Sequence, residues 1–259
     1  MSLSLSLPAV DILFEDLKLG RPPQPFEVPS VGETLSERAR LRDAVHRNLT
    51  QRGLMRAGRV DADTEHTLAT FARAPFSIVA VGQLDDGPLF ARACSDGHFA
   101  IVVTQQENML VFTEIRETAV VPTIVDLLPL TPAARGTSVT VDVPGEKKPE
   151  RREDDEPYDP FAEMRSGRSS LQQRTADRIF NEPMRRVGAF SVSATERGNP
   201  GLPGKQVQVT QLTWFDTAEG RYFATQQHTT DGITKVTYTP GDNARIAGYL
   251  HQAVASHLP

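Results

Sequence analysis

The sequence contains little cysteine and little tryptophan: Cys94 and Trp214 are the sole examples in 259 residues. One cysteine excludes an intramolecular disulfide framework and a zinc cluster of cysteines, and it suits a reducing compartment. No apolar run reaches the roughly 18 residues that a membrane-spanning helix requires. The first residues, MSLSLSLPAVD, lack the basic and continuous apolar regions of a signal peptide and instead alternate like a short strand. We therefore expect a cytoplasmic protein without membrane insertion.

Basic residues are not in excess either. The chain has 28 lysines and arginines against 33 aspartates and glutamates, a formal net charge of −5, and the charges are spread along its length. Nothing resembles the basic stripe that nucleic-acid binding requires. The length is sufficient for a substantial core. We expect a globular protein that does not bind nucleic acid.

The familiar catalytic and cofactor motifs are missing. The sequence has no GxGxxG, no GxSxG and no HExxH. Residues 198–206, GNPGLPGKQ, have neither the spacing nor the Ser or Thr of a phosphate-binding loop, and a strand-like run follows them. The six histidines are scattered, and Cys94 and His98, which flank one turn, supply only two ligands. We predict no catalytic residue, no cofactor and no metal site.

Regular strand-like runs are what the sequence does contain. Four lie between residues 75 and 116, separated by DDG, SDG and QEN, and four more lie between residues 186 and 239. Turn signals at such even spacing indicate antiparallel meanders. Helical patterns flank both sets, at residues 8–20, 34–52, 63–72, near Pro122, 169–183 and 242–256. We predict an α+β fold: a large central, mostly antiparallel β-sheet with two helical groups and a quasi-twofold repeat of helix, four strands and helix.

The clearest helical pattern runs from Thr34 to Arg52. Thr34 and Glu37 match a capping box. The apolar spacing indicates a buried stripe of Leu35, Ala39, Leu41, Val45 and Leu49. Arg38 and Arg42 fall mostly outside that stripe, together with the other arginines of the helix.

A block rich in charge and proline, residues 144–167, separates the two halves. Such a composition buries too little apolar surface to order itself, which favours a solvated linker over an acidic docking segment. We therefore expect one domain, residues 1–259, with halves of about 1–143 and 168–259 joined by this linker.

Aromatic residues gather in residues 212–226, LTWFDTAEGRYFATQ. In a hairpin, Trp214 and Phe215 would point to opposite faces of the sheet, and so would Tyr222 and Phe223. Aromatic side chains would therefore lie on both faces of the hairpin, and both faces must be shielded from water. Either the protein's own helices cover both, or one face is reserved for a partner, since Trp and Tyr are enriched at interface hot spots.

Several different short motifs follow one another in a fixed order along nearly the whole chain. They are Gly32 with Thr34 and Glu37-Arg38, then Arg52-Gly53-Leu54, Arg185-Arg186 with Gly188, Phe215-Asp216-Thr217 with Gly220-Arg221-Tyr222, and Pro240-Gly241-Asp242 with Ile246 and Leu250. In this order they resemble the EspG family, cytosolic chaperones associated with type VII (ESX) secretion in actinobacteria. The motifs are not catalytic, so the resemblance identifies a fold family.

The resemblance implies a chaperone that is not an enzyme and carries no cofactor. Such a protein binds the tip of PE/PPE-like substrates, keeps them soluble and directs them to the secretion machinery. By element, the resemblance implies contact through Trp214, Tyr222, Gln226, Tyr249, Asp85 and Asp86. The alternative is a small-ligand-binding protein or enzyme with a cleft between the two halves. In the free state we expect a monomer or weak dimer.

Overall fold

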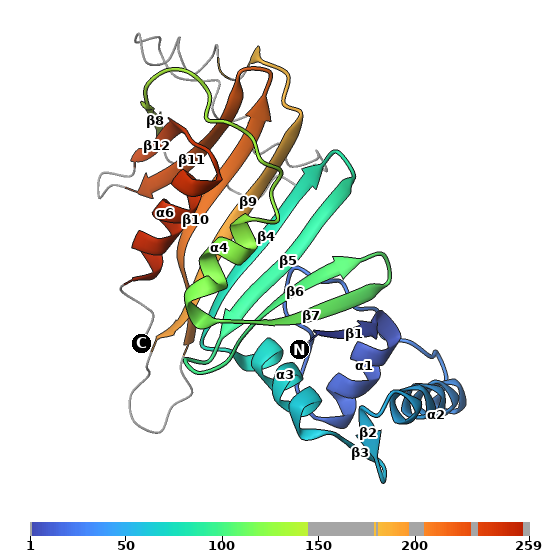
Figure 1. Cartoon of the computed structure of the whole chain (residues 1–259). Coiled ribbons are helices and arrows are strands. Elements are labelled where there is room, and N and C mark those ends of the chain that lie inside the picture. The colour runs from blue at the N-terminus through green and yellow to red at the C-terminus, as the bar shows by residue number, and fades with distance from the viewer. Residues whose placement is uncertain (1, 145–178, 180, 197–204, 229–232, 256–259) are drawn as a thin grey trace.

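The structure, a computed structural model, describes residues 2–144, 179, 181–196, 205–228 and 233–255 (Figure 1). Apart from its first residue, the predicted linker 144–167 lies outside the described residues, as does most of the helix predicted at 169–183.

Helices and strands alternate much as the sequence predicts. The described helices are α1 (Leu7–Asp16), α2 (Leu35–Gln51), α3 (Ala62–Arg73), the 3-10 helix η1 (Glu117–Ala119), α4 (Val120–Val125) and α6 (Asn243–Val254). The strands are β1 (Ser2–Ser6), β2 (Met55–Arg56), β3 (Arg59–Val60), β4 (Phe76–Leu84), β5 (Gly87–Ser95), β6 (Ala100–Gln106), β7 (Met109–Ile115), β8 (Val139–Pro144), β9 (Arg186–Glu196), β10 (Lys205–Thr217), β11 (Gly220–His228) and β12 (Ile233–Pro240).

Side-chain caps fix where the longer helices begin. Ser6, Thr34, Asp61 and Asp242 each accept a hydrogen bond from a backbone N–H in the first turn of α1, α2, α3 and α6. Thr34 and Glu37 form the predicted capping box.

Ten strands form one antiparallel sheet in the order β1-β7-β6-β5-β4-β9-β10-β11-β12-β8 (Figure 1). Strands β4 and β9 pair at its centre, and a four-stranded meander extends outward from each. The outermost strands, β1 and β8, occupy equivalent ends. The predicted fold class is confirmed: two similar halves are joined edge to edge into one sheet. Strand β8, which spans the expected boundary at residue 143, pairs with β12 of the second meander.

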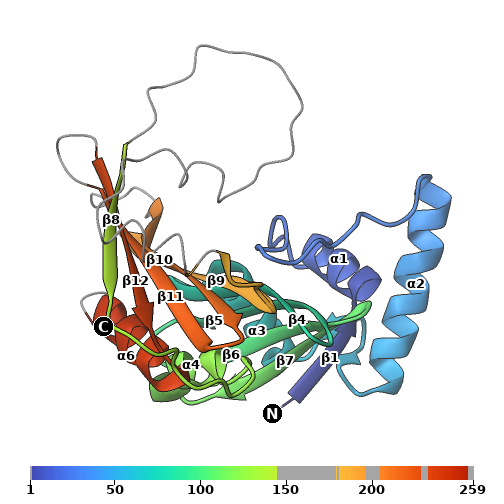
Figure 2. The ribbon, with the colours of Figure 1, turned by 90° about the horizontal axis from the view of Figure 1, so that it is seen from above.

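Helices cover the two faces of the sheet unevenly. On one face, α4 and α6 pack across the middle strands and enclose a core with Phe190, Trp214 and Phe223. On the other face, α1 and α3 cover the β1 end around Phe112, while Tyr238 belongs to a separate core at the β8 end. Figure 2 shows that the sheet is bent, so that β8 at one end and α1 with α2 at the other project to the same side.

The expected apolar stripe of α2 is wrong over its first half. Leu35 is 92% exposed, Ala39 is exposed, and Leu49 is the one fully buried residue of the helix. The side chains that face α1 include two of the arginines that we expected outside the stripe, Arg38 and Arg42.

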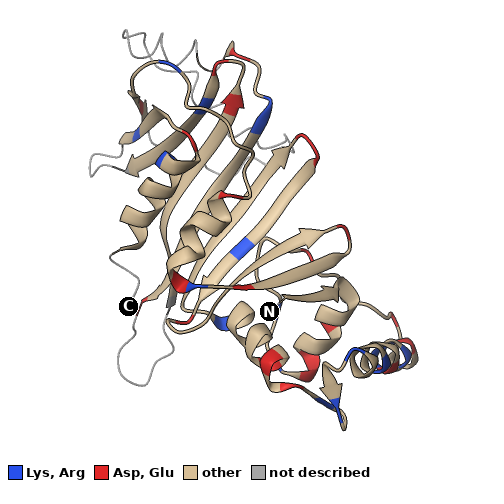
Figure 3. Cartoon of the chain, viewed as in Figure 1, with Lys and Arg blue, Asp and Glu red and all other residues tan. Residues whose placement is uncertain are grey.

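Charged groups hold the first half of α2 against α1, whereas Leu49 near its end packs into the apolar core (Figure 3). Arg38 binds Asp11 and Glu15, and Arg42 Nε donates to Asp16 at 3.0 Å. Hydrogen bonding to Arg38 lowers the pKa of Glu15 below its ordinary value. One turn further along, His46 Nε2 lies 2.7 Å from Asp16. The apolar pattern was misleading because the partner helix presents carboxylates along this seam.

Candidate partner-binding surface

The β10–β11 hairpin separates its four aromatic residues as predicted. Trp214 lies opposite Phe223, and Phe215 lies opposite Tyr222. The first pair belongs to the core beneath α4 and α6, and the second to the core on the other face. The rings of Phe215 and Tyr222 stack with centroids 5.6 Å apart. Both faces are therefore filled by the protein's own residues at this end of the hairpin.

Trp214 is a core residue, with 0% of its surface exposed. Its ring lies 5.0 Å from the guanidinium carbon of Arg221, within range of a cation–π interaction. Tyr222 is 6% exposed, and its hydroxyl donates to the Arg135 carbonyl at 3.4 Å. In this conformation neither aromatic ring is offered to a partner at the surface.

A buried ion pair lies at the turn end of the same hairpin. Arg221 is 0% exposed, and Asp216, directly opposite, is 2% exposed. Arg221 Nε donates to Asp216 Oδ1 at 2.6 Å, and Nη2 donates to Oδ2 at 2.9 Å. This bidentate geometry is the strong form of an arginine–carboxylate pair.

The terminal nitrogens of Arg221 make further hydrogen bonds. Nη1 donates to Asn243 Oδ1 at the start of α6, and Nη2 donates to Pro129 O at 3.0 Å and to Thr131 Oγ1 at 3.2 Å. Asn243 Nδ2 in turn donates to Leu128 O at 3.2 Å. Arg221 therefore ties the hairpin to the loop after α4 and to the first turn of α6.

Arg186 connects this buried pair to the surface. Its Nη1 lies 3.2 Å from Asp216 Oδ2, and its Nε donates to Asp85 Oδ2 at 2.8 Å. Asp85 and Asp86 are both exposed in the β4–β5 turn. Hydrogen bonding to Arg186 lowers the pKa of Asp85. The structure thus holds the predicted contact turn in place through Arg186.

The remaining candidates lie on different faces of the sheet. Gln226 is exposed and lies opposite Val236, on the same face as Tyr222. Tyr249 is half-buried on α6, across the sheet, where its hydroxyl is 3.1 Å from Thr210 Oγ1 and its ring is 5.9 Å from that of Phe223. The alternation of strands therefore prevents the six candidates from forming one continuous patch.

On the face that carries Phe112 and Tyr238, the described helices leave the middle of the sheet less covered than its two ends. Two cross-strand rows cross it, Val79–Ser191–Gln211 and Val81–Ala189–Thr213, and together with Gln226 on β11 we call these residues the open strip. Gln211 and Gln226 are exposed and the other five are partly exposed, whereas Ala80, Phe190 and Trp214 on the opposite face are buried. The strip lies between the cores at the two ends of the sheet.

From the sequence, we expected Asp216 and Arg221 only as parts of a motif, and we predicted no role for Asn243. A signal was present: Asp216 and Arg221 flank a tight predicted turn, which places them opposite each other in an antiparallel hairpin. The partners from the loop after α4 had no such signal, because they meet Arg221 only through the tertiary fold.

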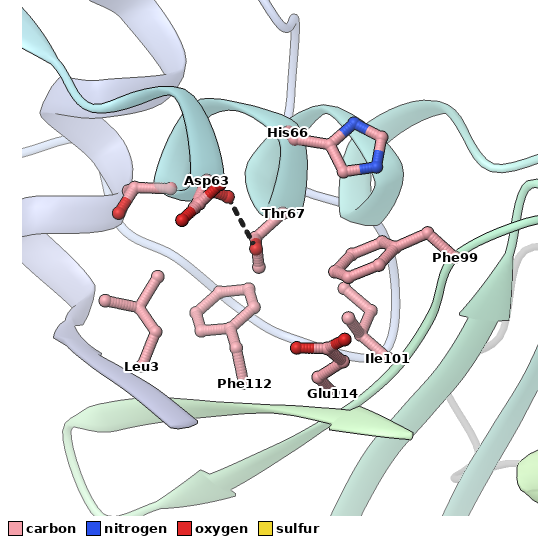
Figure 4. Close-up of a pocket in the computed structure, with 9 residues that line it drawn as sticks. Leu3, Asp63, His66, Thr67, Phe99, Ile101, Phe112 and Glu114 are labelled. Atoms are coloured by element: carbon pink, nitrogen blue, oxygen red, sulfur yellow. Dashed lines mark hydrogen bonds between the residues drawn. The ribbon is translucent and has the colours of Figure 1, made fainter. Parts of the chain in front are cut away.

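Three cavities lined by described residues bear on ligand binding, and an open one of about 750 Å³ lies beside α1, with Asp11, Glu15 and Arg21 among its lining residues. A second, of about 190 Å³, includes Arg135 from the first half and Glu182, Glu219 and Tyr222 from the second. A third, of about 290 Å³, lies beneath α3 (Figure 4). Among the described residues, no group of three or more His, Cys, Asp or Glu side chains is arranged to hold a metal ion. No helix in the described ranges is long and apolar enough to cross a membrane.

Comparison with known proteins agrees with this architecture. No curated protein sequence matches the chain. Among solved structures, the type VII secretion chaperone EspG5 of Mycobacterium tuberculosis, solved in complex with a PE25–PPE41 dimer, is similar with a TM-score of 0.66. The match covers 100% of this chain and 97% of EspG5 at 12% identity, which shows a shared fold. The sequence model of the EspG family matches residues 6–252, so this chain belongs to the EspG family.

Proposed function

We propose that the protein is a chaperone of type VII secretion that binds a PE/PPE-like substrate, keeps it soluble and directs it to the secretion machinery. Membership of the EspG family supports the class, and the EspG5 complex with PE25–PPE41 supports the kind of partner. The observation that carries the proposal here is the open strip, a partly exposed face between two covered ends of the sheet.

The chemistry of the open strip suits a helical client. Ala189, Ser191 and Thr213 are small, so a client backbone can approach the sheet closely. Val79 and Val81 supply apolar surface, while exposed Gln211 and Gln226 supply hydrogen-bonding groups. An exposed apolar tip on a client would otherwise aggregate in water. A shallow face of mixed polarity covers such a tip and still permits release, since it buries a moderate area without deep interlocking.

The surface exposure of each candidate side chain decides whether it can contact the client directly. We propose Gln226 and the turn residues Asp85 and Asp86 as direct contacts, whereas Tyr249, on the face across the sheet from the strip, would act by holding α6 to β10 through Thr210. Trp214 and Tyr222 lie behind these surfaces and would act by keeping the hairpin in place. We further propose that the protein works in the cytoplasm and catalyses no reaction, in line with the role of a binding chaperone.

The alternative, a ligand site between the halves, has a candidate among the described residues. The cavity beside Tyr222 takes lining residues from both halves, but at about 190 Å³ it is smaller than the roughly 300–1,000 Å³ of most ligand sites. The chaperone function is therefore better supported.

Co-expression with a PE/PPE-like pair from the same genome tests the proposal. We expect a soluble complex on size-exclusion chromatography with light scattering, and a client that is insoluble when expressed alone. Ser191→Arg places a long charged side chain in the open strip and should abolish the complex. Ser4→Arg, a matched change at a partly exposed position on the edge strand β1, should not. If the client stays insoluble with the wild-type protein, or if both variants retain it equally, the proposal fails.

A further inference from the structure

A second surface feature lies at the β1 end of the molecule, where α2 ends and the short β2–β3 hairpin follows. Residues 44–60 contain no aspartate or glutamate, in a chain whose formal net charge is −5. They contain four arginines, all exposed, which we call the basic tip: Arg47, Arg52, Arg56 and Arg59. The hairpin extends away from the large sheet beside α2 (Figure 1), and both carry basic residues (Figure 3).

The apolar core holds the base of the hairpin. Met55 is 3% exposed and belongs to the core around α1 and α3, and Val60, directly opposite, packs against the same core. Side chains alternate along a strand, so inward Met55 and Val60 direct Arg56 and Arg59 outward. The core therefore presents these two arginines to solvent on an anchored hairpin.

Arg56 and Arg59 lie directly opposite each other. Such a pair has Cα atoms only about 5.5 Å apart, and like charges placed there repel. Among the described residues, neither arginine forms an ion pair, whereas the arginines of the α1–α2 seam and of the β10–β11 hairpin each bind a carboxylate. Nearby Asp61 instead caps α3 by accepting from Thr64 N at 3.1 Å. The repulsion between the two arginines is therefore not compensated within the described structure.

Arg47 and Arg52 extend the positive surface along the end of α2. Arg52 follows the last residue of the helix, and its Nη2 donates to Ser4 O at 2.7 Å, which holds this side chain beside β1. The other exposed side chains of residues 44–60 are small or uncharged and polar: Ala44, Asn48, Thr50, Gln51 and Ala57. None of the exposed side chains in this range is aromatic or large and apolar.

We propose that the basic tip binds the surface of an anionic membrane, with its guanidinium groups on lipid phosphates. Guanidinium and phosphate form bidentate, charge-assisted hydrogen bonds. A phosphate between Arg56 and Arg59 would also offset their mutual repulsion. Binding would be peripheral, in the headgroup layer, because the tip has no exposed apolar side chain that could enter the hydrocarbon. This inference is independent of the proposed chaperone function.

Other partners match the basic tip less well. A stable protein interface has an apolar core with aromatic anchors, and single-stranded nucleic acid stacks its bases on aromatic rings; the tip offers neither. A small phosphate ligand needs a concave site, and none of the three cavities described above is lined by these arginines. A membrane surface presents many phosphates in one plane, so it requires neither a pocket nor an apolar anchor.

Co-sedimentation of the full-length chain with lipid vesicles tests the proposal. We expect binding to mixed vesicles of phosphatidylglycerol and phosphatidylcholine and no binding to phosphatidylcholine alone. Salt at about 1 M should release the protein, because the Debye length falls to roughly 3 Å. Polyglutamate and a single-stranded oligonucleotide, at the same concentration of negative charge, should bind more weakly than the mixed vesicles. No binding to these vesicles, equal binding to phosphatidylcholine, or tighter binding to either polymer would overturn the proposal.

Variants assign the binding to the basic tip. Arg56→Gln combined with Arg59→Gln should lower the affinity for the mixed vesicles roughly 25-fold, about fivefold for each arginine. Its Tm should be at least that of the wild type, because a repulsive pair is removed. Arg47→Gln alone, on α2, should lower the affinity about fivefold.

The matched control is Arg135→Gln combined with Arg185→Gln, at exposed positions outside the tip. It makes the same change in net charge and should lower the affinity by less than about twofold, because salt screens distant charges. Equal losses in the two double variants, or full affinity in Arg47→Gln and in the hairpin variant, would refute the assignment.

Discussion

The ion pair of Arg221 and Asp216 makes the sharpest prediction about stability. The perturbation is Arg221→Met, which keeps most of the length of the side chain and removes all five of its N–H donors. Asp216 would then remain buried, 2% exposed, with Arg186 at 3.2 Å as its remaining cation. Oxygens of Asn243 and Pro129 would each lose a donor.

The expected cost follows from what is left unpaired. Removing one partner of a buried pair typically costs about 3–5 kcal/mol. Because Arg186 still contacts Asp216, we expect the lower end, about 3 kcal/mol. For a chain of this size that corresponds to a decrease of roughly 6–12 °C in Tm. Arg185, the exposed residue before Arg186, supplies a matched control: Arg185→Met should change the free energy of unfolding by less than about 0.5 kcal/mol.

Urea unfolding of four proteins measures the pair itself: wild type, Arg221→Met, Asp216→Leu and the double variant. Replacing both partners by apolar residues removes the stranded charge, so the double variant should lose less than the sum of the two single losses, by at least about 1 kcal/mol. Additive losses, or an Arg221→Met variant as stable as the wild type, would refute the reasoning that this network holds the hairpin to α6.

Three further predictions concern other parts of the fold. Gly188→Ala would place a Cβ 2.4 Å from Val81 O and 2.7 Å from Trp214 Cζ2, so we expect the free energy of unfolding in urea to fall by about 1–3 kcal/mol. Gly248→Ala, on α6 with open space around it, should instead stabilise the protein by about 0.5–1 kcal/mol. Equal changes in stability for the two variants would contradict the close packing at Gly188. Arg38→Ala should lower the free energy of unfolding by about 1–2 kcal/mol, because its bonds to Asp11 and Glu15 are lost, and by less at high salt. Arg40→Ala, on the exposed side of α2, should leave the stability unchanged. A loss that salt does not reduce would argue against charged groups holding α2 to α1. Burial raises the pKa of Cys94 to about 12, so iodoacetamide should label it slowly at pH 8 in the native protein and rapidly in urea; rapid native labelling would show that the β5 end opens.

The elements of this fold are predictable from sequence because local chemistry specifies them. Turn signals such as Asp85-Asp86-Gly87 and the cap at Thr34 fixed where strands and the α2 helix begin and end. Strand alternation alone also predicts that Trp214 and Phe215 lie on opposite faces, as the structure has them. The repeat of helix, four strands and helix likewise predicted two joined meanders, because neighbouring strands tend to pair in sequence order.

The partners of each surface were not predictable in the same way. Nothing in the pattern of α2 shows that Asp11 and Glu15 face it, since these residues lie on another helix 27 and 23 positions from Arg38. Trp214 illustrates the same limit for the candidate site. A lone tryptophan on a strand suits an interface or a core, and only the positions of α4 and α6 place this one in the core.

The measurement that most directly tests the central claim is photo-cross-linking in the complex with a PE/PPE-like client. A benzophenone side chain would replace Gln211, exposed in the open strip, or Gln252, exposed on α6 across the sheet. If the strip is the client-binding face, the Gln211 position cross-links to the client and the Gln252 position gives little product. Cross-linking at Gln252 alone, in a complex of normal stoichiometry, would contradict the account and move the client to the helical face.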